Sequence, residues 1–174
     1  LVLNKPRGVV TTSKDTHRRK TVLQCLPDVN VRIYPVGRLD MDVEGVLLMT
    51  NDGDLAYRLT HPKHEIPKTY LVTVRGRITD DAVSRLKKGV QLEDGWTAPA
   101  EVMVQKADLR NSTIQLTIHE GRKHEVKRMC DVVGFPVLRM MRISFAGIEL
   151  AGLSPGQWRF LSDSELDKLR LLAG

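Results

Sequence analysis

The sequence predicts an α+β fold in which a mixed, largely antiparallel central sheet is flanked by helices. Strand-like and helix-like segments follow one another without the regular alternation that is typical of parallel α/β proteins. Apolar and polar residues alternate over 113–118, which indicates a half-buried strand, and Ser162-Asp163-Ser164-Glu165 is a capping box that begins a helix. The 174 residues fit one domain, 1–174, or two small lobes that share a cleft.

Short strands are expected in the first half of the chain. Residues 1–4 and 9–12 are apolar or β-branched, and the turn Lys5-Pro6-Arg7-Gly8 separates them. A short helical turn over 21–26 ends at Pro27. Residues 70–74 then form a strand that places Tyr70, Val72 and Val74 on one face.

Four helices are predicted from periodicity and capping residues. The first covers 54–60 and stops before Pro62, and the second begins after Thr79 and ends at Gly89. The third is a basic helix over 122–133, whose apolar stripe is Val126, Met129, Cys130 and Val133, with Gly134 at its end. Paired strands over 137–150 precede the last helix, which runs to Ala173.

The centre of the chain is Gly37-Arg38-Leu39-Asp40 and the apolar run Val46-Leu47-Leu48-Met49 behind it. The run predicts a buried strand, and Asn51-Asp52-Gly53 predicts the turn that closes it. A carboxylate at the entrance to a buried strand is held rigidly and is partly dehydrated. Arg38, two residues before Asp40, lies on the same side of an extended chain. An exposed Arg–Asp pair without function is the alternative reading of these two residues.

The charge balance favours a polyanionic partner. Lysines and arginines exceed acidic residues by six, although solubility alone also explains such an excess. The polar loop 13–20 is either a solvated loop or an arm that contacts phosphates, through Lys14, Arg18, Arg19 and Lys20. Aromatic residues make up only 5% of the chain, so base stacking would depend on very few side chains.

Composition also limits the cellular setting and the chemistry. Cys25 and Cys130 form no spacing motif, which suits a reducing, cytoplasmic environment, and no stretch has the length of a membrane span. The carboxylates Asp40, Asp42 and Glu44 leave a magnesium site open, although no phosphate-binding glycine loop accompanies them. The chain is expected to be a monomer.

A buried catalytic carboxylate needs a cation beside it, because burial alone favours its protonated form. The best candidates are Lys127 and Arg128, which flank the apolar stripe of the basic helix; the alternative is that both are solvated. Tyr70 offers one flat face in a chain poor in aromatics, unless it is only a core residue.

Several ordered motifs resemble one family over essentially the whole chain. The sequence is similar to the catalytic domain of the RsuA/RluB/RluE/RluF-type pseudouridine synthases, and most to the RluB type. The motifs that carry the resemblance are Lys5-Pro6-Arg7-Gly8-Val9-Val10, Gly37-Arg38-Leu39-Asp40, Gly45 to Gly53, His61-Pro62, Lys68-Thr69-Tyr70, Gly121 to Met129, and Gly156-Gln157-Trp158-Arg159.

The resemblance implies a pseudouridine synthase fold with a catalytic cleft, and a reaction at one uridine of a ribosomal RNA stem-loop. It makes Asp40 the catalytic aspartate, Tyr70 the residue that stacks on the uracil, and Lys127 the cation that pairs with Asp40. Arg38 fills the gap left by the flipped nucleotide, and Val126 packs near the other face of the base. Neither a metal nor an organic cofactor is implied. The remaining residues assigned to substrate or RNA binding are Lys5, Arg18, Arg19, Lys20, Arg122, Lys123 and Arg128, of which Lys5 belongs to a motif that supports the site.

Two departures from the family pattern stand out. Val43 replaces the Thr or Ser that usually follows the aspartate by three residues, which puts the loop geometry in doubt. The N-terminal S-four-like RNA-binding domain of the family is expected to be absent from this chain. A catalytically silent RNA-binding module and a metal-dependent phosphohydrolase using Asp40, Asp42 and Glu44 remain the alternative functions.

Overall fold

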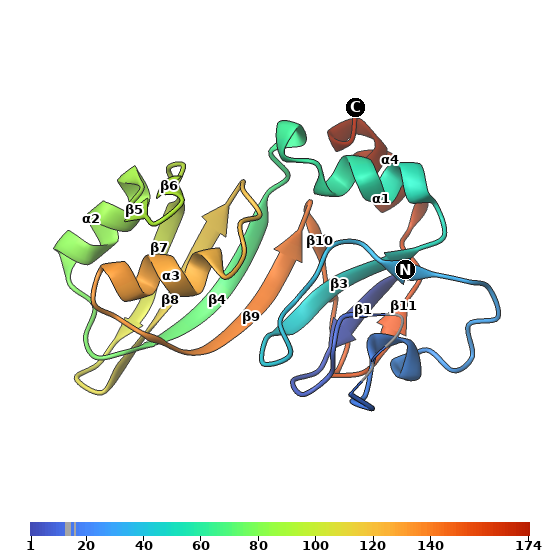
Figure 1. The fold of residues 1–174 in the computed structure, drawn as a ribbon, viewed down its shortest axis with the longest axis horizontal. Helices are drawn as coiled ribbons and strands as arrows, with labels where there is room; N and C mark the ends of the chain where they lie inside the picture. Colours follow the sequence, from blue (N-terminus) through green and yellow to red (C-terminus); the bar gives the residue numbers. More distant parts are fainter. Residues whose placement is uncertain (13–14, 16) are drawn as a thin grey trace. The chain divides into compact units, whose positions relative to one another are not determined.

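The computed structural model describes residues 1–12, 15 and 17–174, which form two compact units. Unit 1 consists of Leu1–Ile66 and Arg142–Gly174, and unit 2 of Pro67–Met141. The strand β9 (Val137–Phe145) contributes its residues up to Met141 to unit 2 and the rest to unit 1. Helices and a largely antiparallel sheet are both present (Figure 1), so the predicted α+β class is confirmed.

In unit 1, the strand predicted from the apolar run is the central element. This strand, β3 (Glu44–Thr50), pairs antiparallel with β1 (Val2–Lys5) and with β2 (Tyr34–Pro35). On its other side β1 pairs with β11 (Trp158–Arg159), and β10 (Ile148–Glu149) pairs with the end of β9. Five consecutive residues of β3, 45–49, are buried, which explains why this strand reads as continuously apolar.

The helices of unit 1 begin where capping residues predict them. Asp52 caps α1 (Gly53–Thr60) by accepting a hydrogen bond from the Leu55 amide at 3.1 Å. The capping box of Ser162 and Glu165 begins α4 (Asp163–Leu172), which packs against α1 (Figure 1). Two 3₁₀ turns, η1 (Val22–Cys25) and η2 (Pro62–His64), complete the unit. The strand predicted over 9–12 is wrong, because only Val10 makes a bridge there, to Thr21.

In unit 2 the strand order is β9, β4, β8 and β7. The alternation predicted for 70–74 and 113–118 is present in β4 (Lys68–Arg75) and β8 (Asn111–Ile118), which pair over their full length from Lys68–Ile118 to Arg75–Asn111. The edge strand β7 (Glu101–Ala107) pairs with β8 and carries an irregularity between Val104 and Lys106. Sequence periodicity did not indicate β7, because most of its side chains are exposed.

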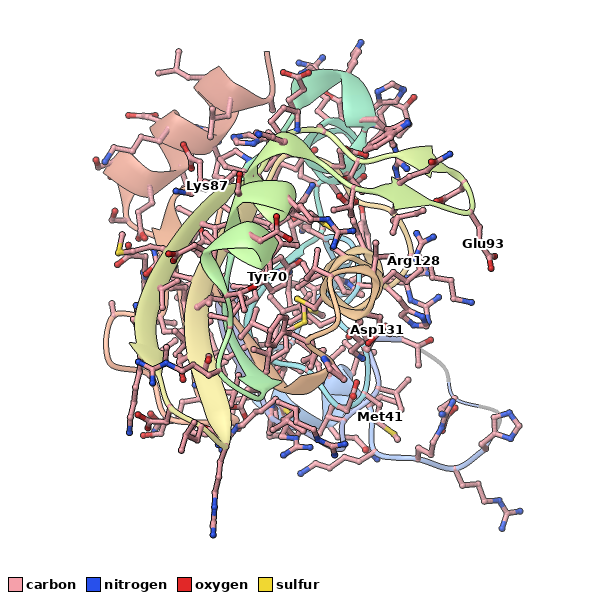
Figure 2. All side chains as sticks on the ribbon, turned by 90° about the vertical axis from the view of Figure 1, so that its left-hand side faces the viewer. Met41, Tyr70, Lys87, Glu93, Arg128 and Asp131 are labelled. Carbon is pink, nitrogen blue, oxygen red and sulfur yellow. The ribbon has the colours of Figure 1, made fainter. Side chains whose placement is uncertain are left out.

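Helices α2 (Asp80–Lys88) and α3 (Glu125–Val132) lie on one side of this sheet (Figures 1 and 2), and the small hairpin of β5 (Gln91–Leu92) and β6 (Gly95–Trp96) accompanies them. Thr79 caps α2 as predicted. The basic helix begins three residues later than predicted, because His124 has a left-handed backbone with φ of 54°. Arg122 and Lys123 therefore lie in the loop before α3.

Candidate active site

Asp40 lies in a loop of unit 1 that is fixed on both sides of the carboxylate. Thr11 is buried, and its hydroxyl donates to the Leu39 carbonyl at 2.7 Å and accepts from the Leu39 amide at 3.3 Å. The carbonyl of Met41 accepts from the Gly8 amide at 2.8 Å, and that of Asp40 accepts from the Val43 amide at 3.0 Å. These bonds hold the backbone while Asp40 itself stays half-buried.

The residues before Asp40 follow the predicted geometry. Arg38 is exposed, Leu39 is buried and Asp40 is half-buried, so the alternation places Arg38 and Asp40 on the same side of the chain. The far end of the loop is held at Gly45, where a methyl group would lie only 2.1 Å from the carbonyl oxygen of Arg142. The buried Arg142 side chain donates from Nε to the carbonyl of Val46 at 2.9 Å. These contacts thus fix the backbone where the loop leads into β3.

Lys5 is completely buried. Its ammonium group donates to the carbonyls of Val9 at 2.8 Å, Pro6 at 2.9 Å and Met41 at 3.4 Å. Burial lowers the pKa of Lys5 to about 8, while the nearby carboxylate of Asp42 acts in the opposite direction. The sequence placed Lys5 among the RNA-binding residues, but a buried ammonium that joins three carbonyls supports the loop from inside.

Unit 2 carries the other predicted catalytic residues. Tyr70 lies on β4 and Val126 on α3, and both are buried. Lys127 follows Val126 on α3 and is half-buried. The sequence prediction that Val126 belongs to the inner face of this helix is confirmed, since Val126, Met129 and Cys130 are all buried.

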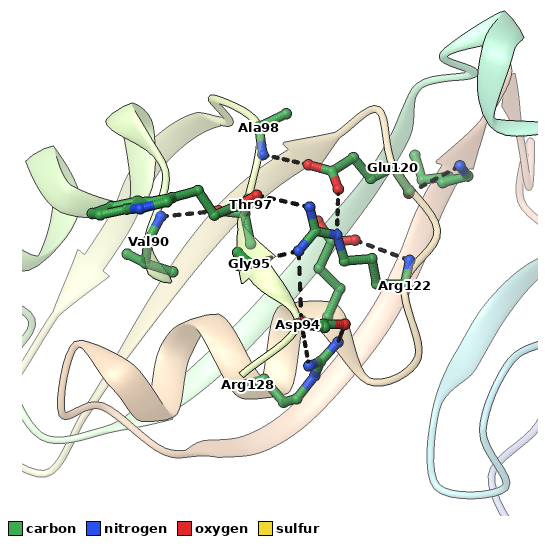
Figure 3. A network of polar contacts seen from close by, with 11 residues as sticks. Val90, Asp94, Gly95, Thr97, Ala98, Glu120, Arg122 and Arg128 are labelled. Carbon is green, nitrogen blue, oxygen red and sulfur yellow. Dashed lines mark hydrogen bonds and ion pairs between the residues drawn. The ribbon is translucent and has the colours of Figure 1, made fainter. Parts of the chain in front are cut away.

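Arg122 and Arg128 make ion pairs and hydrogen bonds within unit 2 (Figure 3). Arg128 forms a two-pronged ion pair with Asp94, with nitrogen–oxygen distances of 2.9 and 3.2 Å. Arg122 pairs with Glu120 at 2.7 Å and donates to the carbonyls of Trp96 at 2.7 Å and Gly95 at 3.2 Å. Figure 2 shows Arg128 on α3 on the side of the hairpin that carries Glu93. Both guanidinium groups are thus engaged within unit 2, and their contact with RNA stays a prediction.

Glu125, at the start of α3, is an internal polar residue that the sequence did not single out. Its carboxylate accepts a hydrogen bond from the Arg122 amide at 3.0 Å, and burial raises its pKa. Arg128 holds the pKa of Asp94 below its usual range, so the Asp94 carboxylate is charged at neutral pH. The loop 119–124 is therefore tied to the β5–β6 hairpin on one side and to α3 on the other.

Comparison with known proteins decides the family. Residues 1–131 match the RNA pseudouridylate synthase family. The chain belongs to this family. It is 44% identical over 174 residues to the ribosomal large subunit pseudouridine synthase B of Bacillus subtilis (strain 168), covering 99% of this chain and 71% of that protein. It is 39% identical over 173 residues to the ribosomal large subunit pseudouridine synthase E of Vibrio parahaemolyticus, covering 91% of this chain and 72% of that protein.

A solved structure agrees with this assignment. The crystal structure of a pseudouridylate synthase superimposes with a TM-score of 0.87 at 35% sequence identity, and the match covers 97% of this chain and 72% of that one. The expected pseudouridine synthase fold is therefore confirmed, and the chain is an RNA pseudouridine synthase of the RsuA/RluB type.

The remaining predicted RNA-binding residues of this pseudouridine synthase lie in loops. Arg18 and Lys20 are exposed, and Arg19 pairs with Asp15 at 2.9 Å. Lys14 lies outside the described residues. Lys123 is exposed in the loop before α3. Among the described members of this group, Arg19 is the residue whose charge is already balanced by a neighbour.

Two further observations concern other kinds of site. In the part of the chain that the structure describes, no three or more His, Cys, Asp or Glu side chains come together as metal ligands would, so Asp40, Asp42 and Glu44 do not converge. None of the described helices has the length and apolar character needed to cross a membrane.

Proposed function

We propose that this pseudouridine synthase isomerises a uridine in a stem-loop of large-subunit ribosomal RNA, and that Asp40 is its catalytic carboxylate. The relatives named as large-subunit enzymes B and E support the choice of RNA. The observation that carries the role of Asp40 is the loop around it: Thr11 fixes Leu39 on one side, the Gly8 amide fixes Met41 on the other, and the carboxylate between them stays half-buried.

The reaction breaks the bond between ribose C1′ and uracil N1, turns the base, and joins C1′ to uracil C5, which then loses its proton. In the proposed mechanism, Asp40 acts either as the nucleophile at C1′ or as a base that removes a ribose proton on a glycal route. Both routes need an ionised carboxylate. A fixed loop is suited to either role, because a catalytic group that is already oriented does not have to be ordered during the reaction.

Base flipping is part of the proposal, because a uridine inside an RNA stem is not accessible to a side chain. Leaving the stack costs a few kcal/mol, and stacking of the uracil on an aromatic ring recovers roughly 1–3 kcal/mol. We assign the stacking to Tyr70, packing near the other face to Val126, and occupation of the vacated space in the RNA to Arg38. Lys127 is the proposed cation for Asp40, and the enzyme is proposed to act as a monomer in the cytoplasm.

The decisive measurement is release of tritium from large-subunit ribosomal RNA labelled at uracil C5, because isomerisation frees that hydrogen. We expect release by the wild-type chain and none by Asp40→Asn, which is close to isosteric and preserves the fold. Asp42→Asn is the matched control: it removes the same charge two residues away and should retain turnover. Thermal unfolding and RNA affinity of the three proteins confirm that they are comparable.

Each result of this experiment has one interpretation. Absence of release by the wild-type chain would leave the silent RNA-binding module as the better description. Turnover by purified Asp40→Asn would remove Asp40 from the catalytic role. Loss of activity on adding EDTA, together with loss in Asp42→Asn, would favour the metal-dependent alternative, although the three carboxylates do not converge in the described structure.

A further inference from the structure

An open pocket of about 600 Å³ lies at the end of unit 2 that carries the β7–β8 turn. It is formed by that turn and by the loop that follows β4, and its lining residues are Arg77, Ala107, Asp108, Leu109, Arg110 and Asn111. Neither the sequence motifs nor the proposed mechanism uses any of these residues. The pocket therefore needs its own explanation.

The backbone around the pocket is held by a buried hydroxyl group. Ser112 is completely buried, and its Oγ donates to the Gly76 carbonyl at 2.8 Å and accepts from the Ile78 amide at 2.8 Å. The Gly76 amide in turn donates to the Arg110 carbonyl at 2.8 Å. Arg77 is thus fixed on both sides along the chain, and Arg110 is attached to the same loop.

The turn itself is also closed. The Asp108 amide donates to the Asn111 carbonyl at 2.9 Å, and the Arg75 amide donates to the Pro136 carbonyl at 2.9 Å. Both strand ends that carry the arginines are therefore ordered by main-chain bonds. Two guanidinium groups can then approach one ligand without an added cost for ordering the backbone.

The cations of this pocket are unused by the fold. Arg77 and Arg110 are exposed, and within the described residues their guanidinium groups have no ion pair and no hydrogen bond. Asp108 is the acidic residue among the described lining residues, and its charge is balanced by Lys106 at 3.2 Å. The pocket therefore keeps a net positive charge. Buried or paired arginines stabilise a fold, whereas unpaired ones on a fixed backbone are suited to bind an anion.

We infer that this pocket binds phosphate groups of the RNA backbone, at a place separate from the modified uridine. Arginine is the residue best matched to a phosphodiester, because its planar fork donates two parallel hydrogen bonds to two phosphate oxygens. The inference rests on the proposed RNA substrate. It assigns Arg77 and Arg110 to the contact and gives Ser112 the part of a positioning residue.

The test compares RNA binding by Arg77→Ala/Arg110→Ala with that of Lys168→Ala/Arg170→Ala. The control removes the same two charges from exposed positions of α4. The probe is a large-subunit ribosomal RNA transcript, titrated between about 50 and about 200 mM salt. The pocket variant should lose about ten-fold or more in affinity, and the slope of log affinity against log salt should fall by about 1–2. The control should change neither beyond the effect of net charge.

A second variant keeps the test independent of the arginine side chains. Leu109 is 84% exposed at the pocket, so Leu109→Glu does not disturb packing and places a negative charge where the phosphate would lie. Leu109→Glu should weaken RNA binding more than Arg170→Ala, which lowers the net charge by the same one unit but at a position on α4, outside the pocket. Equal affinities and equal salt slopes for pocket and control variants would overturn the inference.

Tritium release at saturating RNA separates this inference from the proposed function. Wild-type and Arg77→Ala/Arg110→Ala proteins should release tritium at the same rate, because the pocket residues touch no reacting atom in the proposed mechanism. If the wild-type chain released none, the proposed function would fail whatever the binding showed. If release is normal and the salt slope does not change, only the phosphate pocket is wrong.

Discussion

Two groups of arginines in unit 2 show opposite uses of the same side chain. The clamp arginines, Arg122 and Arg128, are held by Asp94, Glu120 and the carbonyls of the β5–β6 hairpin. The pocket arginines, Arg77 and Arg110, are exposed on an ordered backbone, with no acid partner among the described residues. The number and type of basic side chains are therefore a poor guide to which surface of the protein binds RNA. What distinguishes the two groups is whether the fold supplies carboxylates beside them.

The clamp has a structural reason. Strands β5 and β6 have two residues each, too few for a stable hairpin without outside support. Thr97 gives part of that support, since its hydroxyl accepts from the Val90 amide at 2.9 Å. Arg122 gives further support by joining the hairpin carbonyls to the loop that leads into α3. Because α3 carries Val126 and Lys127, the clamp also orients two residues of the proposed mechanism.

The comparison predicts its largest effect for Arg122→Ala. This variant removes an ion pair of 2.7 Å with Glu120 and the two bonds to the hairpin carbonyls, from a side chain that is mostly shielded. We expect the free energy of unfolding to fall by about 2–3 kcal/mol. Arg77→Ala, by contrast, should stay within about 0.5 kcal/mol of the wild type. Urea unfolding measures both, and similar losses for the two variants would refute the distinction between clamp and pocket.

A smaller effect is expected in unit 1, where Arg159 is another paired arginine. Both of its terminal nitrogens bind Glu165, at 2.8 and 2.9 Å, and this pairing lowers the pKa of Glu165 to about 2. A depressed pKa means that the stabilisation is complete above the unfolded value, near 4.5, and is lost as the pH falls toward 2. Glu165→Gln should therefore be less stable by about 1 kcal/mol at neutral pH.

The pH dependence is what identifies the pair. The difference in free energy of unfolding between wild type and Glu165→Gln should shrink below about pH 4.5, because the unfolded wild-type chain then takes up the proton. Urea unfolding at neutral pH and at about pH 3 measures it. A difference that stays constant over this range would show that the charge of the Glu165 carboxylate does not supply the stabilisation.

Much of the fold was predictable, because its signals are local. Each of the confirmed elements depends on residues close together in the sequence. These elements are the buried run from Val46 to Met49, the alternation in β8, the Thr79 cap and the capping box at Ser162. The edge strand β7 and the hairpin were not predicted. Their side chains are largely exposed, so they carry no hydrophobic period.

The candidate site was predictable in its motif residues but not in their supports. Asp40 and Arg38 follow from the motif, and their relative exposure agrees with an extended chain. The part played by Thr11 was not predictable, because a β-branched threonine reads as an ordinary strand residue. Lys5 and Arg122 were assigned to RNA binding as members of the family motifs that contain them. Only the structure shows that carbonyl oxygens, and for Arg122 also carboxylates, already surround them.

The last prediction tests whether pairing alone keeps the clamp arginines from RNA. Asp94 binds Arg128 at 2.9 and 3.2 Å and lies 3.6 Å from Arg122. Asp94→Ala releases Arg128, whereas Arg122 keeps Glu120 and the hairpin carbonyls, so the fold should remain intact. We expect the salt slope of RNA binding to rise by up to about 1. Asp167→Ala, an exposed position of α4, makes the same change in net charge and should leave the slope unchanged. If both variants behave alike, it is the position of Arg128 on α3, and not its bond to Asp94, that keeps its charge from the RNA.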